Sequence, residues 1–135
     1  MEAARRQKHL VLILAREFAS QLSTPVFITD ADGRIVFYNE PAEDIIGQTF
    51  AETGEIAASD WFARISVETL DGRPVKVDEM PGGVARRERR PVHSTLLITG
   101  MDGQKRLIAD TAFPLLGHDD ELHGSVAIFW EQSTD

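Results

Sequence analysis

Cysteine is missing from this 135-residue chain, and so is any long apolar run. Without cysteine, disulfides, thiolate nucleophiles and cysteine-ligated zinc sites are excluded. The longest apolar run, Leu10 to Ala15, is far shorter than the roughly 20 residues that a membrane-spanning helix needs. Arg16 and Glu17 interrupt this run at once, a pattern that differs from a secretion signal. We therefore expect a cytoplasmic protein without a membrane segment.

Excess positive charge is also missing, because the formal net charge is −8. A chain this acidic is repelled by phosphate backbones, so we expect no nucleic-acid partner. The hydrophobic share is 42%, which in a chain of this length supplies one hydrophobic core rather than two. We therefore expect a single domain.

The N-terminal segment predicts a helix, because residues 2–22 contain neither glycine nor proline. At about 100° per residue, Leu12 and Ile13 fall outside the face that carries five other apolar residues: Val11, Leu14, Ala15, Phe18 and Leu22. The helix either covers only its own domain or also meets a second subunit. We favour the second interpretation and expect a homodimer whose interface is formed by Val11, Leu12, Ile13, Leu14 and Phe18.

A β-hairpin and a short helix are predicted next. Two β-rich segments, 25–29 and 34–38, flank an Asp-Ala-Asp-Gly turn. We expect a positive φ at Gly33, because tight hairpin turns need this conformation and only glycine adopts it freely. Asn39 and Gly47 are suited to cap the two ends of a short helix between them.

The rest of the chain predicts short helices followed by strands. Residues 48–64 predict one or two short helices, and strand candidates follow at 91–99, 104–115 and 122–131. The last strand is apolar on both faces, which is typical of an antiparallel sheet covered on both sides. Because strands and helices do not alternate, this order predicts an α+β fold.

These segments resemble the PAS family over most of residues 22–131. Residues 22–39 are similar to the family's opening hairpin with its Asp-x-x-Gly turn, and residues 40–47 are similar to the helix that follows. Further similar motifs, in the last two strands, are found at 103–106, 112–115 and 124–129. The resemblance implies a five-stranded antiparallel sheet whose central strands come from the two ends of the domain. It also implies short helices over one face, which can enclose a pocket. Because the last strand is apolar on both faces, we expect the N-terminal helix to cover the other face.

The resemblance divides the chain into three parts: an N-terminal helix at 1–21, a PAS domain at 22–131 and a tail at 132–135. PAS sequences usually carry leucines on the central helix, where this chain has Gly82, Gly83 and Arg86. We therefore expect a short or frayed central helix. Arg86 is a candidate for binding an anionic ligand or an acidic partner, although we favour a solvated side chain.

The chain lacks the residues that bind the common PAS cofactors. Haem-binding PAS domains hold iron through a histidine of the central helix, and light-sensing flavin domains use a cysteine. Residues 78–90 contain no histidine and the chain has no cysteine, so we expect a colourless protein without a cofactor. Non-covalent flavin is an alternative, with Trp61 or Trp130 as walls of its pocket, but we favour packing roles for both.

Neither a metal site nor a catalytic site is predicted. The segment from His118 to His123 has side chains able to bind metal, but it matches no ligand template and is expected to be a solvated loop. His93 and Ser94 are neighbours in a strand and therefore point to opposite faces. Since no catalytic constellation assembles, we expect no enzyme.

The predicted function is that of a PAS sensory or signal-transduction module. It senses a small ligand or mediates dimerisation and partner docking, and acts on a separate output domain or protein partner. Two alternatives remain: a PAS domain that serves only protein interaction without a ligand, and, more remotely, a small α+β enzyme.

Overall fold

The computed structural model describes the backbone of residues 2–132 and the side chains of residues 10–132. One antiparallel sheet runs through the described part of the chain, with its strands in the order β3-β2-β1-β7-β6-β5-β4. Their bounds are β1 (Val26–Asp30), β2 (Arg34–Tyr38), β3 (Ile56–Ala57), β4 (Ser66–Glu68), β5 (Val92–Thr99), β6 (Lys105–Leu116) and β7 (Leu122–Glu131).

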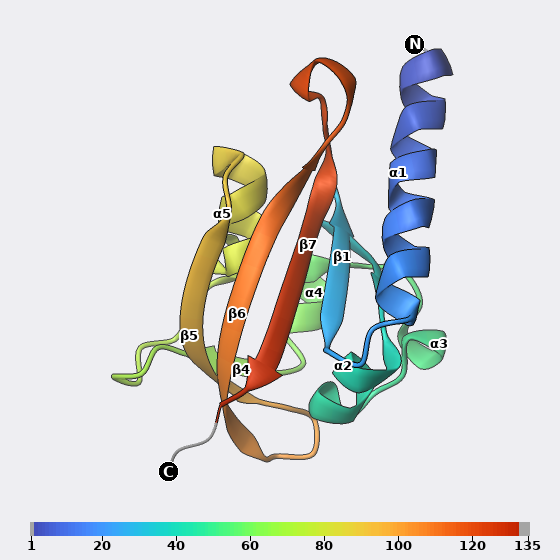
Figure 1. Cartoon of the computed structure of the whole chain (residues 1–135). Helices are drawn as coiled ribbons and strands as arrows, with labels where there is room; N and C mark the ends of the chain where they lie inside the picture. The colour runs from blue at the N-terminus through green and yellow to red at the C-terminus, as the bar shows by residue number, and fades with distance from the viewer. Residues whose placement is uncertain (1, 133–135) are drawn as a thin grey trace.

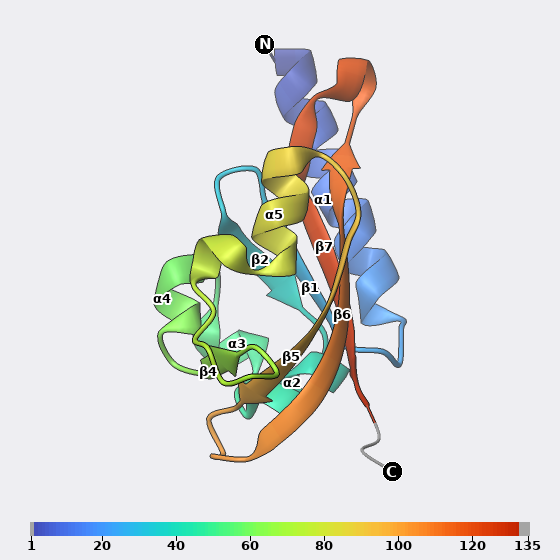
Figure 2. The same cartoon turned by 90° about the vertical axis from the view of Figure 1, so that its left-hand side faces the viewer.

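Helices cover both faces of this sheet (Figures 1 and 2). The long helix α1 (Glu2–Ser20) lies along one face, and the shorter helices lie on the other. The shorter helices are α2 (Glu40–Ile46), α3 (Phe50–Thr53), α4 (Ala58–Phe62) and α5 (Pro81–Glu88), with single 3₁₀ turns η1 (Val77–Glu79) and η2 (His118–Asp120). None of the helices in this part of the chain is long and apolar enough to cross a membrane.

The α+β class and the arrangement of the layers are confirmed, but the predicted number of five strands is wrong. The structure adds β3 and β4, which lie at the two edges of the sheet. The strand β3 pairs with Arg34 and Ile35, and β4 pairs with residues 97–99. Strands of two and three residues are too short to show an alternating pattern, which is why the sequence did not predict them. The tail predicted at 132–135 lies almost entirely outside the described residues.

The two ends of the domain meet at the centre of the sheet, as the resemblance implies. The strands β1 and β7 pair antiparallel, with Ile28 opposite Val126 and Asp30 opposite Gly124. A Cβ at Gly124 would collide with the carbonyl oxygen of Thr29. The close approach of these two strands therefore requires glycine at this position.

Asn39 connects α1, β1 and α2 through one buried side chain. Its Nδ2 donates to the carbonyl oxygens of Ala19 and Thr24, both at 2.9 Å. Its Oδ1 accepts from the backbone N–H groups of Val26 at 3.0 Å and Ala42 at 3.2 Å, and the second of these bonds confirms the predicted N-cap of α2. Asn39 is only 3% exposed, so its four polar contacts are the ones that a buried amide requires.

The face of α1 that packs on the sheet differs from the predicted one. Leu12, Ala15 and Ala19 pack against a cluster of β1 and β7, whereas Leu14 and Phe18 are 59% and 65% exposed. Ala15 was predicted correctly, but the expectation that Leu12 lies off the sheet was wrong. The middle of the helix, residues 10–15, is apolar all round, so periodicity alone could not fix its rotation. The small side chains of Ala15 and Ala19, with the bond from Asn39 to Ala19, favour the observed rotation.

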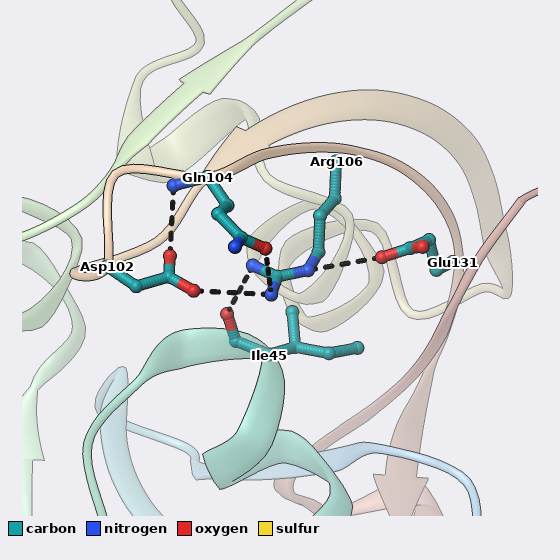
Figure 3. Close-up of polar contacts among 5 residues, drawn as sticks. All are labelled: Ile45, Asp102, Gln104, Arg106 and Glu131. Carbon is teal, nitrogen blue, oxygen red and sulfur yellow. Dashed lines mark hydrogen bonds and ion pairs between the residues drawn. The ribbon is translucent and has the colours of Figure 1, made fainter.

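Arg106 joins three segments at the end of β7 (Figure 3). Its guanidinium donates to the carbonyl oxygen of Ile45 in α2 at 3.1 Å and to Gln104 at 2.9 Å. It also forms ion pairs with Asp102 at 3.2 Å and Glu131 at 3.1 Å. The backbone N–H of Gln104, followed by the Arg106 guanidinium, lowers the pKa of Asp102. These contacts hold α2, the β5–β6 turn and the end of β7 together.

Candidate ligand-binding pocket

A cavity of about 270 Å³ lies between the sheet and the short helices. Side chains from β1, β2, β6 and β7 line it from the sheet, and residues of α2, α4, η1 and α5 line it from the helices. Three lining residues, Asp32, Ser59 and Asp78, are exposed, and they mark where the cavity opens to solvent. The inner part is therefore closed by the core, and the outer part is reachable from water.

Aromatic rings form the apolar wall of the cavity. Phe27 stacks on Phe129 with ring centroids 5.2 Å apart, and it meets Trp61 edge-on at 5.0 Å. Trp61 meets Phe62 in the same way at 4.9 Å. Trp61 is 1% exposed, so it both packs the core and lines the cavity. Core packing and a place on a pocket wall were predicted as alternatives for Trp61, and the ring does both.

The short helix α5 lines the cavity with residues that add little bulk. Gly82 and Gly83 both lie on the cavity wall, where larger side chains would occupy space. A Cβ on Gly82 would already stand 3.6 Å from the hydroxyl of Ser125 in β7, which shows how closely the helix approaches the sheet. The helix has eight residues and ends at Glu88, followed by the C-cap Arg89 with a φ of 55°. The prediction of a short central helix is therefore confirmed.

Arg86 lines the cavity next to the turn of the first hairpin. Gly33 in this turn has a φ of 86°, as predicted. A Cβ at Gly33 would stand 2.7 Å from Nη1 of Arg86, so the guanidinium lies directly against the glycine. Within the described part of the chain, the Arg86 side chain is half-buried and makes no hydrogen bond or ion pair. It therefore keeps its donors available at the cavity.

Asp110 places a buried carboxyl group on the cavity wall, and the sequence analysis did not identify it. It is 7% exposed, and its Oδ1 has no hydrogen-bond partner among the described residues. Burial raises the pKa of Asp110 to about 7. On β6 it shares a face with Ile108 and Ala112, which are both buried. An isolated acidic residue between inward-facing apolar positions is the signal that could have identified it.

Trp130, the other aromatic candidate, lies away from this cavity. Along β7 it alternates with Phe129, which faces the cavity, so Trp130 points to the α1 face of the sheet. It is 43% exposed. It therefore forms no part of the pocket wall, and the packing role predicted for it is wrong because the end of β7 extends beyond the cover of α1 (Figure 1).

An apolar groove of about 370 Å³ runs between α1 and the sheet on this second face. Val11, Leu14 and Phe18 line it from the helix, and Phe113, Leu115, Val126 and Ile128 line it from β6 and β7. Ile13, 56% exposed, is not among the groove residues and lies on the outer side of α1. Three of the five predicted interface residues thus line the groove and Ile13 is exposed outside it, whereas Leu12 packs inside the domain.

The remaining polar candidates do not assemble. The ring Nδ1 of His93 lies 2.6 Å from the hydroxyl of Thr111, while Ser94 lies opposite Asp110 on the other face. The side chain of His118 is 79% exposed, whereas His123 is fully buried in β7. No three metal-binding side chains come together among residues whose side chains are described.

Comparisons with known proteins agree on one family. The family model for the PAS domain matches residues 15–84, more than half of the chain. The fold is similar to the PAS domain of BvgS from Bordetella pertussis, with 16% identity, coverage of 90% of this chain and 85% of that one, and a TM-score of 0.63. No curated protein sequence matches the chain.

Two other solved structures share this fold. One is the phage VqmA–DPO complex, with 12% identity, coverage of 95% of this chain and 56% of that one, and a TM-score of 0.68. The other is the light-state dimer of the fungal blue-light photoreceptor Vivid, with 18% identity, coverage of 82% and 79%, and a TM-score of 0.61. PAS domains are generally sensory modules rather than enzymes. The sequence match and the shared fold show that this chain belongs to the PAS domain family.

Proposed function

We propose that this PAS domain is a small-molecule sensor whose ligand binds in the cavity between the sheet and α5. The observation that carries the proposal is the cavity of about 270 Å³ with the unpaired carboxyl of Asp110 on its wall. Protein interiors are packed as densely as organic crystals and hold few voids larger than a water molecule. A cavity of this size with a polar anchor is suited to a ligand rather than left by imperfect packing.

The composition of the wall supports a ligand that is mostly apolar. The rings of Phe27, Trp61 and Phe129 offer faces and edges against which a flat apolar molecule can pack. The phage VqmA structure, part of which has a similar fold, was solved as a complex with DPO. The signal then passes to an output domain or a protein partner, and we propose that it does so in the cytoplasm.

Fluorescence of Trp61 provides a direct test. In a Trp130→Phe variant the emission comes from Trp61 alone, because the chain has two tryptophans. We expect members of a library of neutral, anionic and cationic small molecules to shift this emission and to raise Tm. Binding should be lost in Ala127→Leu, which fills the cavity, and kept in Phe113→Leu on the opposite face. A library without hits, or hits that still bind Ala127→Leu, would contradict the proposal.

The ligand is proposed to be neither haem nor flavin. The cavity wall offers no histidine or cysteine, and α5 presents glycines and an arginine there instead. The purified protein should therefore show no absorption band in the visible range. A stoichiometric band would identify a chromophore and overturn this part of the proposal.

Dimerisation is the second proposed function, and a specific surface favours it. Leu10, Ile13, Leu14 and Phe18 on α1 are each 55–65% exposed, and burying such a side chain is worth about 1.5–3 kcal/mol. The groove beside them is lined almost entirely by apolar groups. A second copy related by two-fold symmetry can pack the same exposed side chains of its α1 against this groove, so that both copies bury the same surface. The similar Vivid fold was solved as a dimer.

Light scattering at micromolar concentration tests this second proposal. We expect the intact chain to be a dimer and the double variant Ile13→Asp/Phe18→Asp to be a monomer, because buried unpaired charges prevent the contact. Glu17→Gln, also exposed on α1, is the matched control and should remain a dimer. A monomeric intact chain would refute the proposal. A double variant that remains a dimer would show that the interface lies elsewhere on the protein.

A further inference from the structure

The chemistry of the cavity narrows the class of ligand. Asp110 is the only ionisable side chain that is fully buried among the described residues lining the cavity. Its neighbours directly across the sheet are Ser94 on β5 and Phe129 on β7, and neither carries a charge. A buried carboxyl group without a partner loses its hydration and receives nothing in exchange. A ligand that donates to Oδ1 would supply the missing partner.

The cationic side chain on the cavity wall does not pair with Asp110. Arg86 lines the same cavity, yet it forms no ion pair with Asp110, so their charged atoms are more than 4.0 Å apart. The other ionisable residues on the wall are Asp32 and Asp78, both at its exposed part. Three carboxyl groups against one guanidinium leave the wall with an excess of acidic groups. This excess and the net charge of −8 favour the approach of cations.

We infer that the cavity selects small amines with an apolar, preferably aromatic, body, and that the amine donates to Asp110. This inference rests on the proposed function of the cavity as a ligand site. The rings of Phe27, Trp61 and Phe129 receive the apolar body. The ammonium group restores both a hydrogen bond and a counter-charge to the buried carboxylate. An anionic ligand would instead add a second negative charge to the site.

Four probes of nearly equal size test the inference: 2-phenylethylamine, 2-phenylethanol, phenylacetate and ethylbenzene. Affinities are measured at pH 8 by Trp61 fluorescence in the Trp130→Phe protein. We expect the amine to bind at least about tenfold more tightly than the alcohol, which corresponds to one charge-assisted hydrogen bond, and phenylacetate to bind most weakly. If the alcohol, the hydrocarbon or the acid binds as well as the amine, the inference is wrong, although the sensing proposal stands.

The variant Asp110→Asn keeps the shape of the side chain and removes its charge. This variant should bind the amine at least about tenfold more weakly than the wild type does, and its affinity for the alcohol should change less than about threefold. Asp60→Asn, an exposed residue of α4 that does not line the cavity, is the matched control and should leave both affinities nearly unchanged. Equal weakening of amine and alcohol would indicate a structural role for Asp110 and overturn the inference.

The pH dependence gives a second, independent measurement that needs no variant. Because burial raises the pKa of Asp110 to about 7, the carboxylate that the amine needs is mostly absent at pH 6 and mostly present at pH 8. The affinity of the amine should therefore rise about tenfold over this range, while that of the alcohol stays level. If none of the four probes binds, the inference fails, and the wider library alone decides whether the cavity is a ligand site.

Discussion

The two faces of the sheet are both apolar, but they are closed in different ways. On the cavity face, four short helices surround an aromatic core that includes Tyr38, Trp61 and Phe129. On the other face, a single helix lies on a smaller aliphatic core and leaves Phe18 and Phe113 exposed. Several short helices follow the curvature of the sheet on this face (Figure 2), and the cavity lies between them and the sheet. One straight helix covers a stripe and leaves an open groove beside it.

The strands β6 and β7 serve both faces at once. Along β6, Ile108, Asp110 and Ala112 face the short helices, whereas Phe113 and Leu115 face the groove. This alternation follows from the period of two in a β-strand. The same two strands therefore line both the cavity and the groove.

The largest expected effect is the difference in stability lost when each of the two tryptophans is replaced by alanine. Trp61→Ala removes a fully buried ring from the cavity face and should lower the free energy of unfolding by about 3–5 kcal/mol. Trp130→Ala removes a ring that is 43% exposed on the other face and should cost less than about 1 kcal/mol. Urea denaturation followed by circular dichroism measures both. Similar losses for the two variants would mean that the faces do not differ as described.

A second prediction concerns the buried carboxyl group of the cavity face. The pKa of Asp110 is raised from 3.8 to about 7 by burial, so the folded state binds more protons than the unfolded state between these values. The stability of the wild type therefore falls as pH rises through this range. The free energy of unfolding of Asp110→Asn, relative to that of the wild type, should therefore rise by roughly 2–3 kcal/mol from pH 5 to pH 8. Urea denaturation at the two pH values measures this, and a constant difference would contradict the burial of a free carboxyl group.

A third, smaller effect is expected at two glycines with nearly the same positive φ. Gly33 and Gly72 have φ values of 86° and 88°, so an alanine at either position costs about 1–2 kcal/mol in backbone strain. Only Gly33 has a neighbour within reach, the guanidinium of Arg86. Because the end of an arginine side chain can move away, we expect nearly equal losses of stability in thermal unfolding. Gly33→Ala should alter ligand affinity through the displaced Arg86, and Gly72→Ala should not.

The sequence predicted the regular parts of this fold well. The last strand was placed at 122–131, the same residues as β7, and the caps Asn39 and Gly47 were identified because each needs a particular residue type. The edge strands β3 and β4 were missed because two or three residues carry no periodic signal.

The site was harder to predict than the fold. Trp61 and Arg86 were found, because large or basic residues stand out in their segments. Asp110 was not identified as a site residue, although a lone acidic residue between Ile108 and Ala112 indicates a buried carboxyl. The rotation of α1 depends on the hydrogen bond between Asn39 and Ala19, which joins residues twenty positions apart. No local pattern reports such a contact.

The smallest expected effect is on the side of α1 that lines the groove, and it tests whether this face belongs to the folded monomer or to a dimer. Phe18 is 65% exposed, so Phe18→Ser should change the stability of the monomer by less than about 0.5 kcal/mol. Leu12→Ala, on the side that packs against β1 and β7, is the matched comparison and should cost about 2 kcal/mol. The measurement is thermal unfolding at several protein concentrations, because association makes Tm depend on concentration. Tm of the wild type should rise with concentration and that of Phe18→Ser should not; a large loss for Phe18→Ser at the lowest concentration would place this ring in the monomer core instead.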